Sequence, residues 1–149
     1  MITKNLKYVL SVALLCLLLT GCKKEPNLFF AKITADIKSL NLKNGAELVV
    51  TDVHISDPYM QKGDDGDKVP VTEYEIDRVE FFIANRMVGE DNTPPYTLNY
   101  TLADLPAGDH QFRVDMIVTH LPKRIDRDKR FQWGHRARVG STYTLKVKE

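Results

Sequence analysis

Alternation of apolar and polar residues is the feature that most constrains how this chain of 149 residues can fold. Between residues 29 and 37 the odd positions are apolar, whereas Lys32, Thr34 and Asp36 are polar. A period of two is typical of a half-buried β-strand. Similar stretches lie at residues 49–55, 79–83, 96–102, 112–118 and 143–147, and the apolar pair Met87-Val88 follows a turn near Asn85-Arg86. About seven short strands, separated by turn residues and without a convincing helical pattern, predict an all-β antiparallel sandwich.

Residues 1–21 have the parts of a secretory signal peptide. Lys4 and Lys7 form a basic start, and an apolar run from Tyr8 to Leu19 follows. The run is about 12 residues long, shorter than the roughly 20 that a membrane-spanning helix needs. The segment therefore predicts export rather than a transmembrane anchor.

The end of this segment, Leu19-Thr20-Gly21-Cys22, resembles the lipobox of bacterial lipoproteins. In that family the cysteine thiol is acylated, for example with palmitate, and the chain is cut just before it. The resemblance implies that Cys22 is lipidated and becomes the first mature residue; the alternative is an ordinary signal peptide with a chance cysteine. A multiply acylated cysteine holds a protein stably on a membrane, whereas one acyl chain binds only marginally.

Cleavage before Cys22 leaves residues 22–149, the size of one ordinary domain. The formal net charge of the whole chain is +1, so global charge indicates no partner and argues against nucleic acid. Cys16 lies in the signal and Cys22 carries the lipid, so no thiol remains for a disulfide, a metal site or a nucleophile. We expect no cofactor and no metal.

Residues 22–28 are expected to form the lipidated cysteine and a short tether. Lys23 stands where an aspartate would favour inner-membrane retention in some Gram-negative bacteria, so delivery to the outer membrane is expected. The segment Lys23-Lys24-Glu25 also resembles, in part, the surface-export signals of Bacteroidetes lipoproteins, although it holds only one acid. Periplasmic and surface-facing orientations both stay open.

A motif spread over residues 76–118 resembles bacterial immunoglobulin-like domains. Its residues are Ile76, Val79-Glu80-Phe81-Phe82, Val88-Gly89, Asp91, Pro95-Tyr96, Leu102, Leu105, Ala107-Gly108, His110 and Val114. The resemblance implies an immunoglobulin-like antiparallel β-sandwich over residues 29–149. Domains of that family mostly act as spacers, adhesion modules or glycan-associated accessories, so the fold alone does not identify a function.

One segment departs from the family, in which the last hairpin usually has a short loop. Residues 119–141 form a basic insert, expected to be an extended hairpin or loop. Its cations outnumber Asp126 and Asp128, and its aromatic residues are Phe131 and Trp133. The cations are Lys123, Arg124, Arg127, Lys129, Arg130, Arg136 and Arg138.

Arginine and lysine beside exposed aromatic side chains suit anionic glycans, lipid headgroups or an acidic protein surface. The candidate ligand-binding residues are Trp133, Phe131, Arg127, Lys129, Arg130 and Arg136. The alternative is a hairpin whose Trp133 packs on the sandwich while its charges keep the protein soluble.

Other candidate sites are better explained as structural features. The segment Asp64-Asp65-Gly66-Asp67 offers carboxylates for calcium but lacks the spacing of a full calcium loop, so a solvated turn is favoured. The four histidines, His54, His110, His120 and His135, lack metal-ligand spacing. Glu80 and Asp115 are expected on strand exteriors as neighbours, where salt bridges are commoner than a glycosidase pair.

The sequence thus predicts a non-catalytic, lipid-anchored lipoprotein of the bacterial cell envelope. The expected partners are the membrane, through the lipid on Cys22, and envelope proteins, for which the domain acts as a structural or interaction module. The alternative is a glycan-binding accessory lipoprotein that uses the basic insert.

Overall fold

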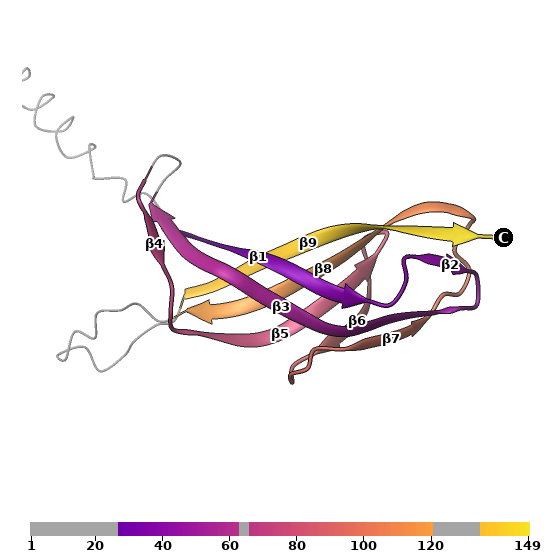
Figure 1. Cartoon of the computed structure of the whole chain (residues 1–149), viewed down its shortest axis with the longest axis horizontal. Helices are drawn as coiled ribbons and strands as arrows, with labels where there is room; N and C mark the ends of the chain where they lie inside the picture. The colour runs from indigo at the N-terminus through magenta and orange to yellow at the C-terminus, as the bar shows by residue number, and fades with distance from the viewer. Residues whose placement is uncertain (1–26, 63–65, 121–134) are drawn as a thin grey trace, which may run out of the picture.

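The computed structural model describes residues 27–62, 66–120 and 135–149. Within these ranges the chain forms nine β-strands in two sheets (Figure 1). They are β1 (Asn27–Ile37), β2 (Asn41–Lys43), β3 (Glu47–Lys62), β4 (Lys68–Pro70), β5 (Tyr74–Ile83), β6 (Arg86–Asp91), β7 (Leu98–Thr101), β8 (Gly108–His120) and β9 (His135–Lys148). In this part of the chain, no helix is long and apolar enough to cross a bilayer.

The strands form an immunoglobulin-like β-sandwich, as the sequence predicts. Sheet A has the order β1-β3-β4, and β7 also pairs with β3. Sheet B has the order β2-β9-β8-β5-β6. Pairing is antiparallel except between β2 and β9, which run parallel. Seven strands lie where the sequence predicts them. The two others, β2 and β4, have three residues each and are too short to show an alternating pattern.

The predicted end of the second strand at Asp57-Pro58 is wrong, because β3 continues to Lys62. Between the pairs Phe30–Tyr59 and Lys32–Ser56, two residues of β3 face one residue of β1. This is a β-bulge, which bends a strand without ending it, and Asp57 accommodates it with a φ of 49°. The first strand likewise begins at Asn27, two residues before the predicted boundary.

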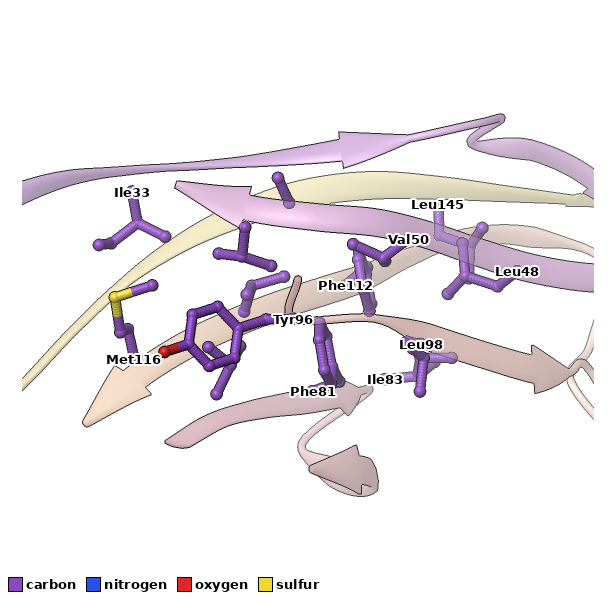
Figure 2. Close-up of a cluster of buried hydrophobic side chains, with 14 of the residues drawn as sticks. Ile33, Leu48, Val50, Phe81, Ile83, Tyr96, Leu98, Phe112, Met116 and Leu145 are labelled. Carbon is purple, nitrogen blue, oxygen red and sulfur yellow. The ribbon is translucent and has the colours of Figure 1, made fainter. Parts of the chain in front are cut away.

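The core lies between the sheets and is built from the alternating apolar residues (Figure 2). The rings of Phe81 and Phe112 stack with their centroids 6.4 Å apart, and Tyr143 lies 6.2 Å from Phe112. The largest fully buried side chains are Phe81, Phe112, Leu48, Leu102, Met116, Leu145, Val50, Val79, Val114 and Val118. Burial of this apolar surface is the main source of stability in a domain that has no disulfide among its described residues.

Two side chains of β9 close one side of the sandwich. β1 is an edge strand, so one row of its backbone groups has no strand partner. The Ala35 N–H donates to the Tyr143 hydroxyl at 2.8 Å, and the Ser141 hydroxyl donates to the Ile33 carbonyl. These bonds join sheet A to sheet B and satisfy backbone groups that would otherwise need water.

Several residues of the immunoglobulin-like motif stabilise turns or close packing between strands. The Asp91 carboxylate accepts the N–H groups of Thr97 and Thr93 at 2.9 and 3.1 Å, and these bonds lower the pKa of Asp91 below its ordinary 3.8. His110 Nε2 lies 2.7 Å from the Pro106 carbonyl, to which it donates. A Cβ at position 89 would lie 2.6 Å from Leu98 Cδ1, so Gly89 leaves room for the Leu98 side chain. The motif is thus explained by the fold.

Neighbouring phenylalanines give a direct test of strand register. Phe81 is fully buried in the core, whereas Phe82 lies on the other face of sheet B, 4.4 Å beneath the Arg113 guanidinium carbon. We expect Phe81→Ala to lower the free energy of unfolding by about 3–5 kcal/mol, as large aromatic truncations in cores do. Phe82→Ala should cost clearly less, since its ring stays partly exposed. Urea denaturation of both variants measures this; equal losses would mean that the two faces are exchanged.

Candidate functional site

The outer face of sheet B carries a cluster of paired charges, here called the arginine–carboxylate cluster: Arg78, Glu80, Arg113, Asp115 and Arg138. Glu80 on β5 and Asp115 on β8 are directly opposite each other in the ladder. Their side chains point away from the core, because they alternate with core residues. They are nevertheless buried, with relative exposures of 2% and 5%.

Arg138 bridges the two carboxylates. Its Nη1 lies 2.9 Å from Glu80 Oε2 and 2.9 Å from Asp115 Oδ2. Arg78 Nη2 lies 2.7 Å from Glu80 Oε1, and Arg113 Nε lies 3.2 Å from Asp115 Oδ1. The hydrogen bond to Asp115, with the negative charge of Glu80, raises the pKa of Arg138 above its ordinary value. Three guanidinium groups therefore compensate two adjacent negative charges.

A glycine makes room for this arrangement. Gly140 on β9 pairs with Asp115, and a Cβ there would meet the Asp115 carboxylate and lie 2.7 Å from the Val114 carbonyl oxygen. Any other residue at position 140 would have to displace the Asp115 carboxylate or the backbone of β8. Gly140 is not among the site residues predicted from the sequence, although a glycine inside a strand often marks such a close approach.

The expectation for Glu80 and Asp115 was correct in one respect and wrong in another. They are neighbours on the outer face, but they are not exposed. Arginine side chains cover them, since the aliphatic stem of an arginine can lie over a surface while its head stays in water. Bound by arginines on both sides, the carboxylates act as hydrogen-bond acceptors in a structural network.

Arg136 lies on β9 in the structure, rather than in a loop. Its Nη2 is 2.7 Å from Asp77 Oδ2, and the Thr119 hydroxyl donates to Asp77 Oδ1 at 3.0 Å. β8 extends to His120 and β9 begins at His135, so the ends of the predicted insert belong to paired strands. Five candidate residues, Arg127, Lys129, Arg130, Phe131 and Trp133, lie outside the described residues.

The strand ends that flank residues 121–134 lie at the end of the sandwich where β1 begins (Figure 1). Ile33 and Ala35 of β1 bond to Ser141 and Tyr143 of β9, so the two strands run in the same direction. Counting back along both strands, the start of β1 falls beside the start of β9. The predicted lipid site and the basic insert are therefore connected to the same end of the domain.

A small pocket lies farther along the sandwich. It has a volume of about 240 Å³, and the Arg86 guanidinium donates to the Tyr100 hydroxyl in its wall at 2.8 Å. The volume is below the roughly 300 Å³ at which ordinary ligand pockets begin. No sequence pattern predicts this pocket, since its lining comes from β5, β6, β7 and the loop after β7.

His54 and His110 have structural partners, the latter being the Pro106 carbonyl. His54 Nε2 lies 2.9 Å from Asp36 Oδ2, a hydrogen bond that raises the pKa of His54 above its ordinary 6.5; Asp52 adds to the shift. Among the residues that can be described, no group of three or more histidine, cysteine or acidic residues is arranged to hold a metal. Of the Asp64–Asp67 segment, residues 64 and 65 lie outside that part.

A family comparison agrees with the fold over part of the chain. Residues 71–114 match the family described as the bacterial Ig domain, a stretch that covers β5, β6, β7 and the first half of β8. Among solved structures, the chain is similar to the fibronectin(III)-like modules of Clostridium thermocellum CbhA, with 18% identity and a TM-score of 0.40 over 80% of this chain and 100% of that one. No curated protein matches the sequence. The predicted immunoglobulin-like resemblance is confirmed for this stretch.

The arginine–carboxylate cluster predicts unequal effects at two arginines of β9. We expect Arg138→Gln to lower the free energy of unfolding by about 2–3 kcal/mol, because it leaves two buried carboxylates adjacent without their bridge. This is below the usual cost of about 3–5 kcal/mol for a buried pair, since Arg138 is half exposed and Arg78 and Arg113 remain. The control Arg136→Gln removes a more exposed pair and should cost less than about 1 kcal/mol. Thermal and urea unfolding compare them; equal costs would contradict the bridging role.

Proposed function

We propose that the protein is a lipid-anchored lipoprotein of the bacterial envelope whose immunoglobulin-like sandwich is a non-catalytic structural or protein-interaction module. The observation that carries this proposal is the lipobox ending at Cys22, followed almost at once by the first strand at Asn27. The domain is thus joined to its anchor by a tether of a few residues. Lys23 favours delivery to the outer membrane.

The chemistry of the described surface supports a module without catalysis. The two buried carboxylates, Glu80 and Asp115, are paired with arginines and do not line the pocket. A glycosidase pair would need one carboxyl group free to give a proton and another free to face substrate. Immunoglobulin-like domains commonly serve as spacers and interaction surfaces, which fits a domain placed close to a membrane.

A second candidate function, glycan binding, is favoured by the basic insert. Arg127, Lys129, Arg130 and Trp133 combine positive charge with an aromatic ring, a combination suited to acidic polysaccharides. Arg136 contributes less to such a site, because Asp77 already neutralises it. The insert joins the domain at its anchored end, so a glycan bound there would lie near the membrane.

The anchor predicts loss of lipidation in one cysteine variant. Cys22→Ser should remove incorporation of labelled palmitate and release the protein from membranes or leave it unprocessed, because the serine oxygen does not replace the thiol in this modification. The matched control is Cys16→Ser, which changes the other cysteine within the signal and should keep the label. Metabolic labelling followed by membrane fractionation gives the result. Palmitate in the Cys22→Ser protein would falsify the lipoprotein proposal.

The glycan alternative predicts salt-sensitive binding. Binding to acidic polysaccharide should weaken as salt is added, since charges in solvent are screened beyond about 10 Å at 0.1 M salt. Replacing Arg127, Lys129 and Arg130 with Ser should also weaken this binding, because it removes three positive charges, and should change the melting temperature little. Trp133→Ala should weaken binding if the ring stacks on the ligand, and should lower the melting temperature if it packs on the sandwich. The matched control replaces Lys43, Lys146 and Lys148 with Ser in the same way. These lysines are exposed at the opposite end of β9, so their loss should leave binding unchanged. Binding unchanged in the insert variants would exclude this function.

A further inference from the structure

An exposed apolar surface lies on the outer face of sheet A, here called the shelf: Leu28, Phe30, Tyr59, Lys68 and Pro70. Leu28 and Phe30 are 41% and 37% exposed; Val69 of β4, at the same end but on the other face of sheet A, is 53% exposed. Leu28 and Phe30 lie in the first residues of β1, and both point away from the core because Phe29 points into it.

The shelf is an ordered arrangement across three strands. Phe30 pairs with Tyr59, and Tyr59 pairs with Pro70, so one row crosses β1, β3 and β4. The rings of Phe30 and Tyr59 stack with centroids 5.2 Å apart and planes 19° apart. Lys68 Nζ lies 4.9 Å from the centroid of the Tyr59 ring. The result is an aromatic surface with a cation at its margin.

Most of the remaining outer face of these two strands is polar. Beyond the β-bulge, β1 presents Lys32, Thr34 and Asp36 to solvent, and β3 presents His54 and Ser56. Apolar exposure on this face is therefore concentrated at the end where β1 begins. This end of sheet A therefore presents large apolar side chains that the sandwich itself does not cover.

The covalent tether limits what that contact can be. Asn27 comes five positions after Cys22, and an extended chain over those five steps spans at most about 18 Å. The shelf starts one residue later, at Leu28. An acylated Cys22 would hold it within a short distance of the bilayer surface in every orientation of the domain.

We propose that the shelf rests on the interface of the membrane that holds the lipid of Cys22; this rests on the anchor proposed above. Aromatic rings with a polar tip, such as Tyr59, favour the level of the lipid headgroups, where one end is apolar and the other wet. Lys68 adds attraction to anionic headgroups. Leu28 and Phe30 provide the apolar area that an interfacial contact buries.

This contact orients the domain. The shelf lies on sheet A, so sheet A faces the bilayer at the anchored end, and the outer face of sheet B, with its arginine–carboxylate cluster, faces away. A lipid alone would leave the domain free to rotate about its tether. Two attachments, the acyl chains and the shelf, restrict it to one tilt.

A dye at the shelf of the lipidated protein tests the proposal. With Cys22 acylated and Cys16 removed with the signal, a Leu28→Cys variant carries one reactive thiol, to which an environment-sensitive dye is attached. The protein is placed in phosphatidylethanolamine–phosphatidylglycerol vesicles that contain a headgroup nitroxide quencher. The control is Met87→Cys, a 47% exposed apolar position on β6, roughly 20 Å farther along the sandwich by strand geometry.

The shelf dye should be quenched several-fold more strongly than the Met87 dye, and Phe30→Ser in the same protein should remove most of the difference. Equal quenching at both positions, in protein that still carries palmitate and stays on the vesicles, would overturn the shelf contact and leave the anchor intact. Absence of palmitate would overturn both. A photocrosslinker at position 28 that captures an envelope protein in cells, with equal dye quenching, would reassign the shelf to a protein partner.

Discussion

The hydrogen bonds between β1 and β9 determine which segments of the chain lie together at each end of this domain. Tyr143 and Ser141 bond the free edge of β1, which fixes β1 beside β9 and parallel to it. This pairing of side chains with backbone places the start of the domain next to the connection between β8 and β9. If β1 were aligned in the other direction, the proposed lipid site and the basic insert would lie at opposite ends. The proposed anchor position and the proposed orientation of the domain both depend on this alignment.

The arginine–carboxylate cluster shows a different way of using an outer sheet face. Burying a charge is costly unless it is paired and hydrogen-bonded, and Glu80 and Asp115 satisfy that condition only together with Arg138 and the absence of a side chain at Gly140. Such a network requires one alignment of β5, β8 and β9, because a slip of one residue would turn the carboxylates into the core. The face therefore contributes to register as well as to solubility.

Much of the fold could be predicted from the sequence, because a strand that is buried on one face alternates apolar and polar residues with a period of two. Phe81 and Phe82 illustrate this, since alternation alone assigns one to the core and the other to the opposite face. The same reasoning failed where pairing was long-range or backbone-driven. β2 is held by parallel pairing with β9, and β3 passes through Asp57-Pro58 by means of a β-bulge; neither leaves an alternating pattern. Burial of Glu80 and Asp115 depends on Arg78, Arg113 and Arg138, which come from three strands.

The opposed positions of the start of β1 and the end of β9 have a mechanical consequence (Figure 1). If the first is held at a membrane and force is applied at the second, β1 is drawn one way and β9 the other. The Tyr143 and Ser141 contacts, and the parallel pairing of β2 with β9, lie across that direction. Bonds perpendicular to a pull are strained together, whereas those of a peeled hairpin break one after another. The domain is thus built to resist stretching along its long axis better than peeling from its edge.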